Sequence, residues 1–210
     1  MGSGIVFWNV DTQKDFVEPG GRLYVKDAEK LKPIWEEIRN LAAEKNIRVV
    51  NTADYHFPDA PEISETPDFI HTFPQHCMAG NEGSEYVDET RPDKACTINW
   101  DKKIPYGELH ELVGNSRNCV ILKNVFDMFA GNPNTEDVLK IMDPETVIVY
   151  GVTTNVCVDF AVKGLAGRVK NVYVVKDAIK ELPLIPLPFD EWGRAGVKLI
   201  KFNDLKDMLA

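Results

Sequence analysis

The sequence lacks three features that would assign it to common protein classes. It has no apolar run of the roughly 18 residues that a membrane-spanning helix needs, so we expect no membrane role. It has no excess of positive charge, because 24 Lys and Arg stand against 33 Asp and Glu, and a net charge of −9 disfavours binding to nucleic acid or anionic lipid. The start of the chain has no basic, then apolar, signal-peptide pattern, so we expect a cytoplasmic protein.

Cysteine is also scarce. The four cysteines, Cys77, Cys96, Cys119 and Cys157, include no CxxC pair and do not have the density of a small disulfide-stapled domain. A reducing environment is therefore the default expectation. The question that remains is whether one of the four serves chemistry rather than packing.

What is present is an alternation of short apolar segments and helical patterns. A composition of 44% hydrophobic and 27% charged residues suits one α/β domain with a sizeable core. Helical spacing marks 27–44, 107–113, 135–142 and 155–166, and seven segments are typical of strands: 5–10, 47–52, 95–99, 119–122, 146–150, 171–175 and 197–202. Strands that alternate with helices predict βαβ crossovers and a mainly parallel sheet.

Two stretches have little periodicity. Residues 54–93 are polar and Pro-rich, and loops of this length in a compact domain are usually functional. The second, Leu182–Pro188, reads LPLIPLP and is interpreted as a surface connection or a lip that faces a partner. Trp100 and Trp192 stand in polar surroundings and fit either an interface or the rim of a pocket.

Chemically capable residues follow the strands of the predicted sheet. Ligands of open parallel sheets bind beyond the carboxyl ends of the strands, and Asp11, Asp54, Lys123 and the turn before Cys157 all fall there. Cys157 also stands where a helix begins, and the free N–H groups of a helix N-terminus favour a thiolate of depressed pKa. Such a set suits amide hydrolysis through a thioester, with Cys157 as nucleophile, Asp11 as acid and base, and Lys123 as a stabilising cation.

Each residue also has a plainer interpretation. Cys157 can be a packing residue at a strand–helix junction, Asp11 a turn residue and Lys123 a solvated strand end. A second cluster lies in the long loop, where Asp54 and His56 have the spacing of two ligands on one side of an extended segment, followed by His71 and His76. Asp and His together suit zinc, iron or manganese, whereas the alternative is that these histidines cap turns or pack against aromatic rings.

Three motifs resemble the isochorismatase-like cysteine hydrolases, which include the nicotinamidases. Residues 11–16 (DTQKDF) resemble their D-x-Q-x-D-F opening, residues 122–129 (LKNVFDMF) their catalytic lysine, and residues 151–158 (GVTTNVCV) their nucleophile turn G-V-x-T-x-x-C-V. The resemblance implies one hydrolase domain over residues 1–210, with a three-layer fold and a six-stranded parallel sheet. It also implies an Asp11–Lys123–Cys157 triad, a cis peptide between Val152 and Thr153 in the oxyanion turn, and a homo-oligomer (dimer or tetramer).

The long loop narrows the resemblance. Residues 54–56 (DYH) and 73–80 (FPQHCMAG) are similar to the nicotinamidase pattern D-W-H … W-P-x-H-C-V-x-G, which implies that Asp54, His56 and His76 bind a divalent metal, with zinc ahead of iron or manganese. Many nicotinamidases have a further histidine where this chain has Glu62, whose carboxylate can bind the ion directly or through water. The aromatic walls that would hold a flat ring are Phe16, Phe73 and Phe126.

The resemblance implies hydrolysis of nicotinamide or a similar small carboxamide to the acid and ammonia. The segment after Lys123 is shorter than in many nicotinamidases, which keeps open a second reading: a cysteine hydrolase acting on another small amide, such as a ureido or carbamoyl compound. A third reading is a non-catalytic binding protein of the same fold. Under that reading the thiol of Cys157 would react slowly with iodoacetamide, because only a catalytic thiol is expected to have a depressed pKa.

Overall fold

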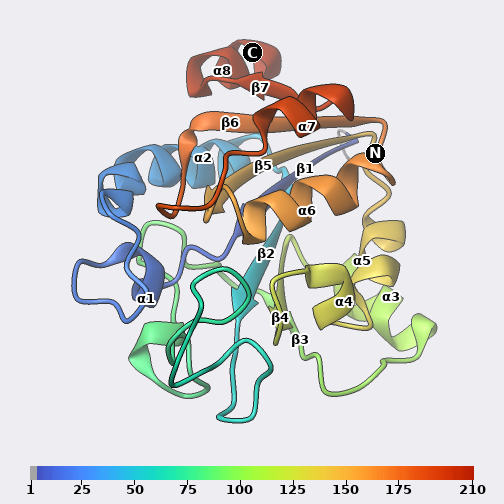
Figure 1. Ribbon diagram of the computed structural model, residues 1–210. Coiled ribbons are helices and arrows are strands. Elements are labelled where there is room, and N and C mark those ends of the chain that lie inside the picture. The colour runs from blue at the N-terminus through green and yellow to red at the C-terminus, as the bar shows by residue number, and fades with distance from the viewer. Residues whose placement is uncertain (1–3) are drawn as a thin grey trace.

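One parallel sheet organises the chain, as the computed structural model shows for residues 4–210 (Figure 1). The start of the chain, where no signal peptide is expected, includes three residues that lie outside this range. The sheet has seven strands in the order β3-β4-β2-β1-β5-β6-β7, and every neighbouring pair is parallel. Its strands are β1 (Ile5–Val10), β2 (Arg48–Asp54), β3 (Cys96–Ile98), β4 (Asn118–Lys123), β5 (Thr146–Val152), β6 (Asn171–Lys180) and β7 (Lys198–Ile200). The α/β fold class predicted from the sequence is confirmed.

The prediction of six strands, implied by the family resemblance, is wrong for this chain. The seventh strand, β7, extends the edge beyond β6 and pairs through Tyr173↔Lys198, Val174↔Leu199 and Val175↔Ile200. Strand β6 is ten residues long, and its first half pairs with β7 on one edge while its other edge pairs with β5. The seven apolar segments of the sequence each overlap one of these strands.

Helices cover both faces of the sheet. In Figure 1, α6 (Cys157–Ala166) lies in front of the central strands and α2 (Lys32–Glu44) lies behind them. The remaining helical segments are α1 (Lys14–Val17), η1 (Ala28–Leu31), η2 (Glu82–Ser84), α3 (Tyr106–Gly114), α4 (Met128–Gly131), α5 (Thr135–Met142), α7 (Phe189–Arg194) and α8 (Phe202–Leu209). None of the helices in the described range is long and apolar enough to cross a membrane.

Two helices begin later than the sequence pattern indicates. The helix expected over 27–44 divides into the 3₁₀ turn η1 and the α-helix α2, because Pro33 has no N–H to bond back into a preceding α-helical turn. The helix expected over 155–166 begins at Cys157, because the backbone before it forms the turn that leaves β5. This second shift places the cysteine in the first position of α6.

Strands β1 and β5 approach each other closely where they reach this turn. Val10 pairs with Gly151, whose φ is +124°. A Cβ at Gly151 would lie 2.0 Å from the carbonyl oxygen of Val10, so a side chain cannot fit between the strands. Glycine is required here both by the backbone conformation and by the contact.

Candidate active site

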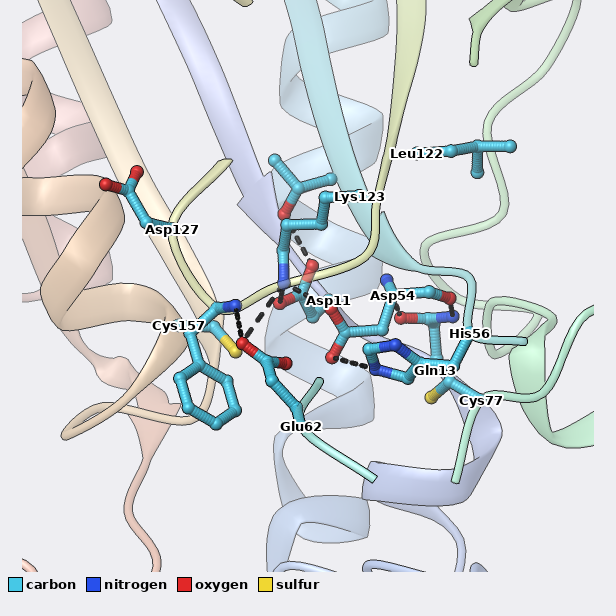
Figure 2. Close-up of polar contacts among 12 residues, drawn as sticks. Asp11, Gln13, Asp54, His56, Glu62, Cys77, Leu122, Lys123, Asp127 and Cys157 are labelled. Atoms are coloured by element: carbon cyan, nitrogen blue, oxygen red, sulfur yellow. Dashed lines mark hydrogen bonds and ion pairs between the residues drawn. The ribbon is translucent and has the colours of Figure 1, made fainter. Parts of the chain in front are cut away.

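The carboxyl ends of three strands bring one lysine and two carboxylates together. Asp11 follows β1 directly, whereas Asp54 and Lys123 end β2 and β4 and are Cα partners in the sheet register. The Nζ of Lys123 lies 2.9 Å from Oδ2 of Asp11, forms an ion pair with Oδ1 of Asp54, and lies 3.7 Å from Sγ of Cys157. Figure 2 shows these side chains converging from the ends of three strands and from the start of α6. The convergence expected at this sheet edge is therefore present.

Burial makes the charges of this cluster interdependent. Lys123 is only 1% exposed and Asp11 is fully buried. Burial opposes the charge of Lys123, but the two carboxylates outweigh it and hold its pKa well above the usual value. At Asp54 burial is likewise overcome by Lys123 and the neighbouring histidines, which hold the pKa of this carboxyl well below its usual range.

Asp11 behaves differently from Asp54. Burial raises the pKa of Asp11, and Lys123 and the hydroxyl of Thr52, which donates to Oδ1 at 2.6 Å, only partly offset that effect. Oxygen atoms of Asp11 and Asp54 and the sulfur of Cys157 all lie within 4.8 Å of one another. A carboxyl group of raised pKa beside a thiol is suited to exchange a proton with it.

The thiol of Cys157 does not have the depressed pKa expected from its place at a helix N-terminus. Its side chain is almost fully buried, and this burial raises the pKa well above the usual value, with Lys123 opposing the shift and the carboxylates of Asp11 and Asp54 adding to it. In this environment the resting group is a thiol. A catalytic Cys157 in this environment would also react slowly with iodoacetamide near neutral pH. Slow labelling therefore does not distinguish a binding protein from a hydrolase.

The turn between β5 and α6 leaves two backbone N–H groups near the cysteine without a backbone acceptor among the described residues. The peptide bond between Val152 and Thr153 is cis. In the described part of the chain, the N–H groups of Thr154, Val156 and Val158 donate to backbone carbonyls, whereas no acceptor is found for the N–H groups of Thr153 and Cys157.

Asp54, His56 and His76 form a compact group of potential metal ligands. One ligand atom from each lies within 4.8 Å of the others, and Oδ2 of Asp54 is 3.8 Å from Nε2 of both histidines. Nδ1 of His76 lies 2.7 Å from the carbonyl oxygen of Pro74, which leaves its Nε2 for an ion. Within residues 4–210, Oδ2 of Asp54 and Nε2 of His56 are buried without a hydrogen-bond partner. Such orphaned groups are costly unless something binds them, so this set fits a divalent ion.

The other histidine and the acid of this loop stand apart from that group. The side chain of His71 is 81% exposed and lies 3.2 Å from Asp68, in keeping with its place outside the motif. Glu62 is not among the clustered ligands: one of its oxygens accepts the backbone N–H of Phe126. Burial, reinforced by the charge of Asp54, raises the pKa of Glu62 to about 8.

Two residues of the D-x-Q-x-D-F motif connect the loop to the strands, a role that could not be assigned to them from the sequence. The side-chain amide of Gln13 donates to the carbonyls of Asp54 and Ser84 and accepts the N–H of Asp54. Asp15 accepts the N–H of Cys77, next to His76, at 2.6 Å. Their place in the motif was the only available signal, because both residues position the backbone by hydrogen bonds and neither takes part in the proposed chemistry.

Aromatic and aliphatic side chains close the space above Cys157. The cavity has about 10 Å³ of free volume, enough for about one water molecule. Its lining includes the three aromatic residues expected from the sequence together with Leu182, at the start of the Pro-rich segment: Phe16, Phe73, Phe126 and Leu182. A flat ring can enter only if these walls move apart.

The Pro-rich segment is attached to the nucleophile turn. The side-chain amide of Asn155 donates to the carbonyls of Leu182 and Ile185 and accepts the N–H of Leu182. The segment is thus a lip of the pocket that is held from the turn preceding Cys157. Trp192, by contrast, is not on a rim: it is 1% exposed and its Nε1 donates to Asp159.

Comparison with known proteins agrees with the fold and the motifs. The isochorismatase domain matches residues 99–184. Nicotinamidase/pyrazinamidase of Mycobacterium tuberculosis (strain ATCC 25618 / H37Rv) is 35% identical over 77 residues, which span 37% of this chain and 40% of that protein. The resemblance to the isochorismatase-like hydrolases, drawn above from three motifs, is confirmed.

Solved structures match over nearly the full chain. N-carbamoylsarcosine amidase from Thermoplasma acidophilum has a TM-score of 0.72 at 24% identity, covering 97% of this chain and 98% of its own. Pyrazinamidase of Pyrococcus horikoshii in complex with zinc has a TM-score of 0.69 at 23% identity, covering 94% and 99%. At these identities the likeness establishes the fold, and the chain accordingly has the isochorismatase-like hydrolase fold.

Proposed function

We propose that this chain, as one hydrolase domain, is a metal-containing cysteine amidohydrolase that converts nicotinamide or a similar ring carboxamide to the acid and ammonia. The observation that carries the proposal is the meeting of Asp11, Lys123 and Cys157 beside an orphaned Asp–His–His group. The nicotinamidase/pyrazinamidase relative and the zinc-complexed pyrazinamidase support the same activity and the same metal.

The first half-reaction uses the shared proton of the Asp11–Cys157 pair. Asp11 accepts the thiol proton as Sγ attacks the amide carbon, because a thiol of raised pKa needs a base at the moment of attack. The backbone N–H groups of Thr153 and Cys157 stabilise the oxyanion, and Lys123 holds Asp11 in place. Asp11 then returns the proton to the amine as the C–N bond breaks, which leaves a thioester and releases ammonia.

The second half-reaction reverses these proton movements. Asp11 takes a proton from water as the oxygen attacks the thioester, and then gives that proton to the departing sulfur of Cys157. The products are the carboxylic acid and the free thiol. One and the same carboxyl group thus acts in turn as base, acid, base and acid.

Asp54, His56 and His76 would hold the divalent ion. When bound, such an ion attracts a ring nitrogen or an equivalent donor of the substrate and orients its carboxamide. The aromatic side chains of Phe16, Phe73 and Phe126, which line the pocket together with Cys157, would then enclose the ring. Zinc is the expected metal, because a buried Asp–His–His set suits it, although iron and manganese use similar ligands.

A second candidate is a cysteine hydrolase that acts on a ureido or carbamoyl compound. The compact segment between Lys123 and α4 and the fold likeness to N-carbamoylsarcosine amidase favour it. The composition of the pocket favours the ring carboxamide instead. Among its lining residues are three aromatic rings but no Arg or Lys to pair with the carboxylate of a carbamoyl amino acid.

Ammonia release from a substrate panel tests the proposal. Zinc-loaded protein is assayed with nicotinamide and pyrazinamide against N-carbamoylsarcosine and an uncharged ureido compound, and Cys157→Ala serves as the inactive comparison. We expect turnover of the ring carboxamides and its loss in the variant. Turnover of the ureido compounds alone would establish the second candidate, and no release from any of the four by either protein would contradict both.

Three further expectations accompany the proposal. A small-molecule substrate suits the enclosed pocket, and nothing in the net charge of −9 invites nucleic acid or an anionic membrane. We propose a homo-oligomer and a cytoplasmic location. Gel filtration with light scattering and fractionation of cells test these two.

A further inference from the structure

A pair of cysteines outside the catalytic cluster joins the sheet's edge strand to its neighbour. Cys96 opens β3 and Cys119 lies in β4, and the two are direct Cα partners in the parallel ladder. Their sulfur atoms lie 2.9 Å apart, and both residues are buried. We propose that Cys96 and Cys119 form a site of oxidative modification at which a peroxide converts the two thiols to a cross-strand disulfide.

The backbone already has the geometry that such a bond requires. Paired residues of neighbouring parallel strands are about 4.8 Å apart, within the Cα separation of about 4.4–6.8 Å found for disulfides. Direct partners point their side chains to the same face of the sheet, as the sulfur contact confirms. The sulfur atoms need to approach by about 0.9 Å to reach a bond of about 2.05 Å, which small side-chain rotations supply.

The two thiols differ in the way a stepwise oxidation needs. The hydrogen bond from Cys119 is the main cause that lowers the pKa of Cys96 to about 7, against the effect of burial. The same interaction raises the pKa of Cys119. Cys96 is therefore the thiol with appreciable thiolate near neutral pH, and it is the sulfur that attacks an oxidant.

The reaction balances with one molecule of hydrogen peroxide. The Cys96 thiolate attacks one peroxide oxygen, the O–O bond breaks, and the products are a sulfenic acid at Cys96 and hydroxide. The sulfur of Cys119 then attacks the Cys96 sulfur and expels the second oxygen as water. The proton that Cys96 released on ionising neutralises the hydroxide, and the Cys119 proton leaves with the oxygen of the sulfenic acid, so two thiols and one peroxide yield one disulfide and two water molecules.

Neither cysteine belongs to a group of potential metal ligands. The clusters of three or more such residues in the described range are Asp54–His56–His76 and Asp11–Asp54–Cys157, and neither includes this pair. The pair lies at the edge of the sheet, where β3 is three residues long and pairs with β4 alone. A covalent bond there would fasten the strand to which the long loop returns.

Peptide mapping of the wild-type protein tests the proposal. Zinc-free protein is treated with hydrogen peroxide, its remaining thiols are alkylated in denaturant, and trypsin then places Cys96 in residues 95–102 and Cys119 in residues 118–123. We expect these two peptides to be joined, with a mass two hydrogens below their sum, and to separate on reduction. Alkylated Cys96 and Cys119 after treatment, or their linkage to Cys77 or Cys157, would overturn the proposal.

Thermal unfolding supplies a second readout. A disulfide that closes the loop from Cys96 to Cys119 is expected to raise Tm by about 6–12 °C in a chain of 210 residues. Cys96→Ser and Cys119→Ser should each remove the rise on oxidation while leaving the Tm of the reduced protein within a few degrees. An equal rise in either variant would show that oxidation acts elsewhere. The mapping on wild-type protein decides the matter even if a variant fails to fold.

Discussion

The proposed site has a strand-borne half and a loop-borne half, and the two are held by different forces. Asp11, Asp54 and Lys123 sit at strand ends whose register is fixed by the ladder of backbone hydrogen bonds. His56 and His76 lie in residues 55–93, where regular structure is limited to η2 and isolated bridges. The strand-borne half therefore carries groups whose positions follow from the sheet, whereas the loop-borne half needs separate fastenings.

Those fastenings come from the strand-borne half. Gln13 bonds both to Asp54 and to Ser84, and Asp15 bonds to the residue after His76. The loop is thus aligned with the reacting groups through side chains from the segment that follows β1. The difference teaches that one motif, residues 11–16, supplies the proposed proton carrier and also positions the proposed metal ligands.

Replacement of the base should have the largest effect. Asp11→Asn removes the group that exchanges the proton with Cys157, and general acid–base catalysis contributes about 10²–10⁴-fold. We expect kcat for ammonia release to fall by that factor with little change in metal content. The exposed acid Asp207, in Asp207→Asn, provides the control. A loss of less than tenfold in Asp11→Asn would remove Asp11 from the proton path.

Replacement of a loop ligand should act on the metal first. His56→Ala removes one of three clustered ligands, and because loss of even an outer-shell partner costs about 10–100-fold in affinity, we expect zinc affinity to fall at least about 100-fold. Isothermal titration of metal-free protein measures it. His71→Ala, an exposed histidine of the same loop, should bind zinc as the wild type does. Equal losses in both variants would contradict the proposed ligand set.

Loosening the connection between the halves should cost stability. Gln13→Ala removes three hydrogen bonds to backbone groups of Asp54 and Ser84, each contributing about 0.5–1.5 kcal/mol, so we expect the free energy of unfolding to fall by about 2–4 kcal/mol. Urea unfolding measures it, with the exposed Gln75→Ala as the matched control. A fall in Gln13→Ala no larger than in the control would show that the loop is held by other contacts.

The smallest effect should come from Glu62 and depend on pH. Its pKa is raised from 4.5 to about 8 in the folded protein, so the folded state holds this proton more tightly than the unfolded state does. The free energy of unfolding that this proton contributes is fully present below pH 4.5 and is lost as the pH rises through 8. Urea unfolding of metal-free protein at pH 6 and 8.5 should show wild type losing about 2–3 kcal/mol relative to Glu62→Gln. A pH-independent difference would contradict the raised pKa.

The sequence was informative where regular structure decides position. The ends of apolar strands predicted that Asp11, Asp54 and Lys123 meet, because parallel strands present their carboxyl ends to one edge. The register pair Asp54↔Lys123 gives this expectation its physical basis. The family motifs added His56 and His76 as ligands, which periodicity could not assign within an irregular loop.

Other properties depend on long-range packing and were not predictable. The pKa of Cys157 follows burial more than its helix N-terminus, and burial is a property of everything packed around it. The contact of Glu62 with Phe126 joins residues far apart in sequence. The Pro-rich segment Leu182–Pro188 could be interpreted only as a surface connection or a lip, because the bonds that locate it come from Asn155, which has no periodic or motif signal for that role.

Gly151 has a consequence for how this chain tolerates mutation. It bears no reactive group, yet it keeps β5 against β1, and those strands lead to Cys157 and Asp11, respectively. A side chain there would force the two strands apart and lengthen the path of the transferred proton. Random variants of this chain should therefore include inactive ones that retain every chemical group of the site. The spacing of the proposed nucleophile and base thus depends on Gly151, a residue without a side chain that could take part in catalysis.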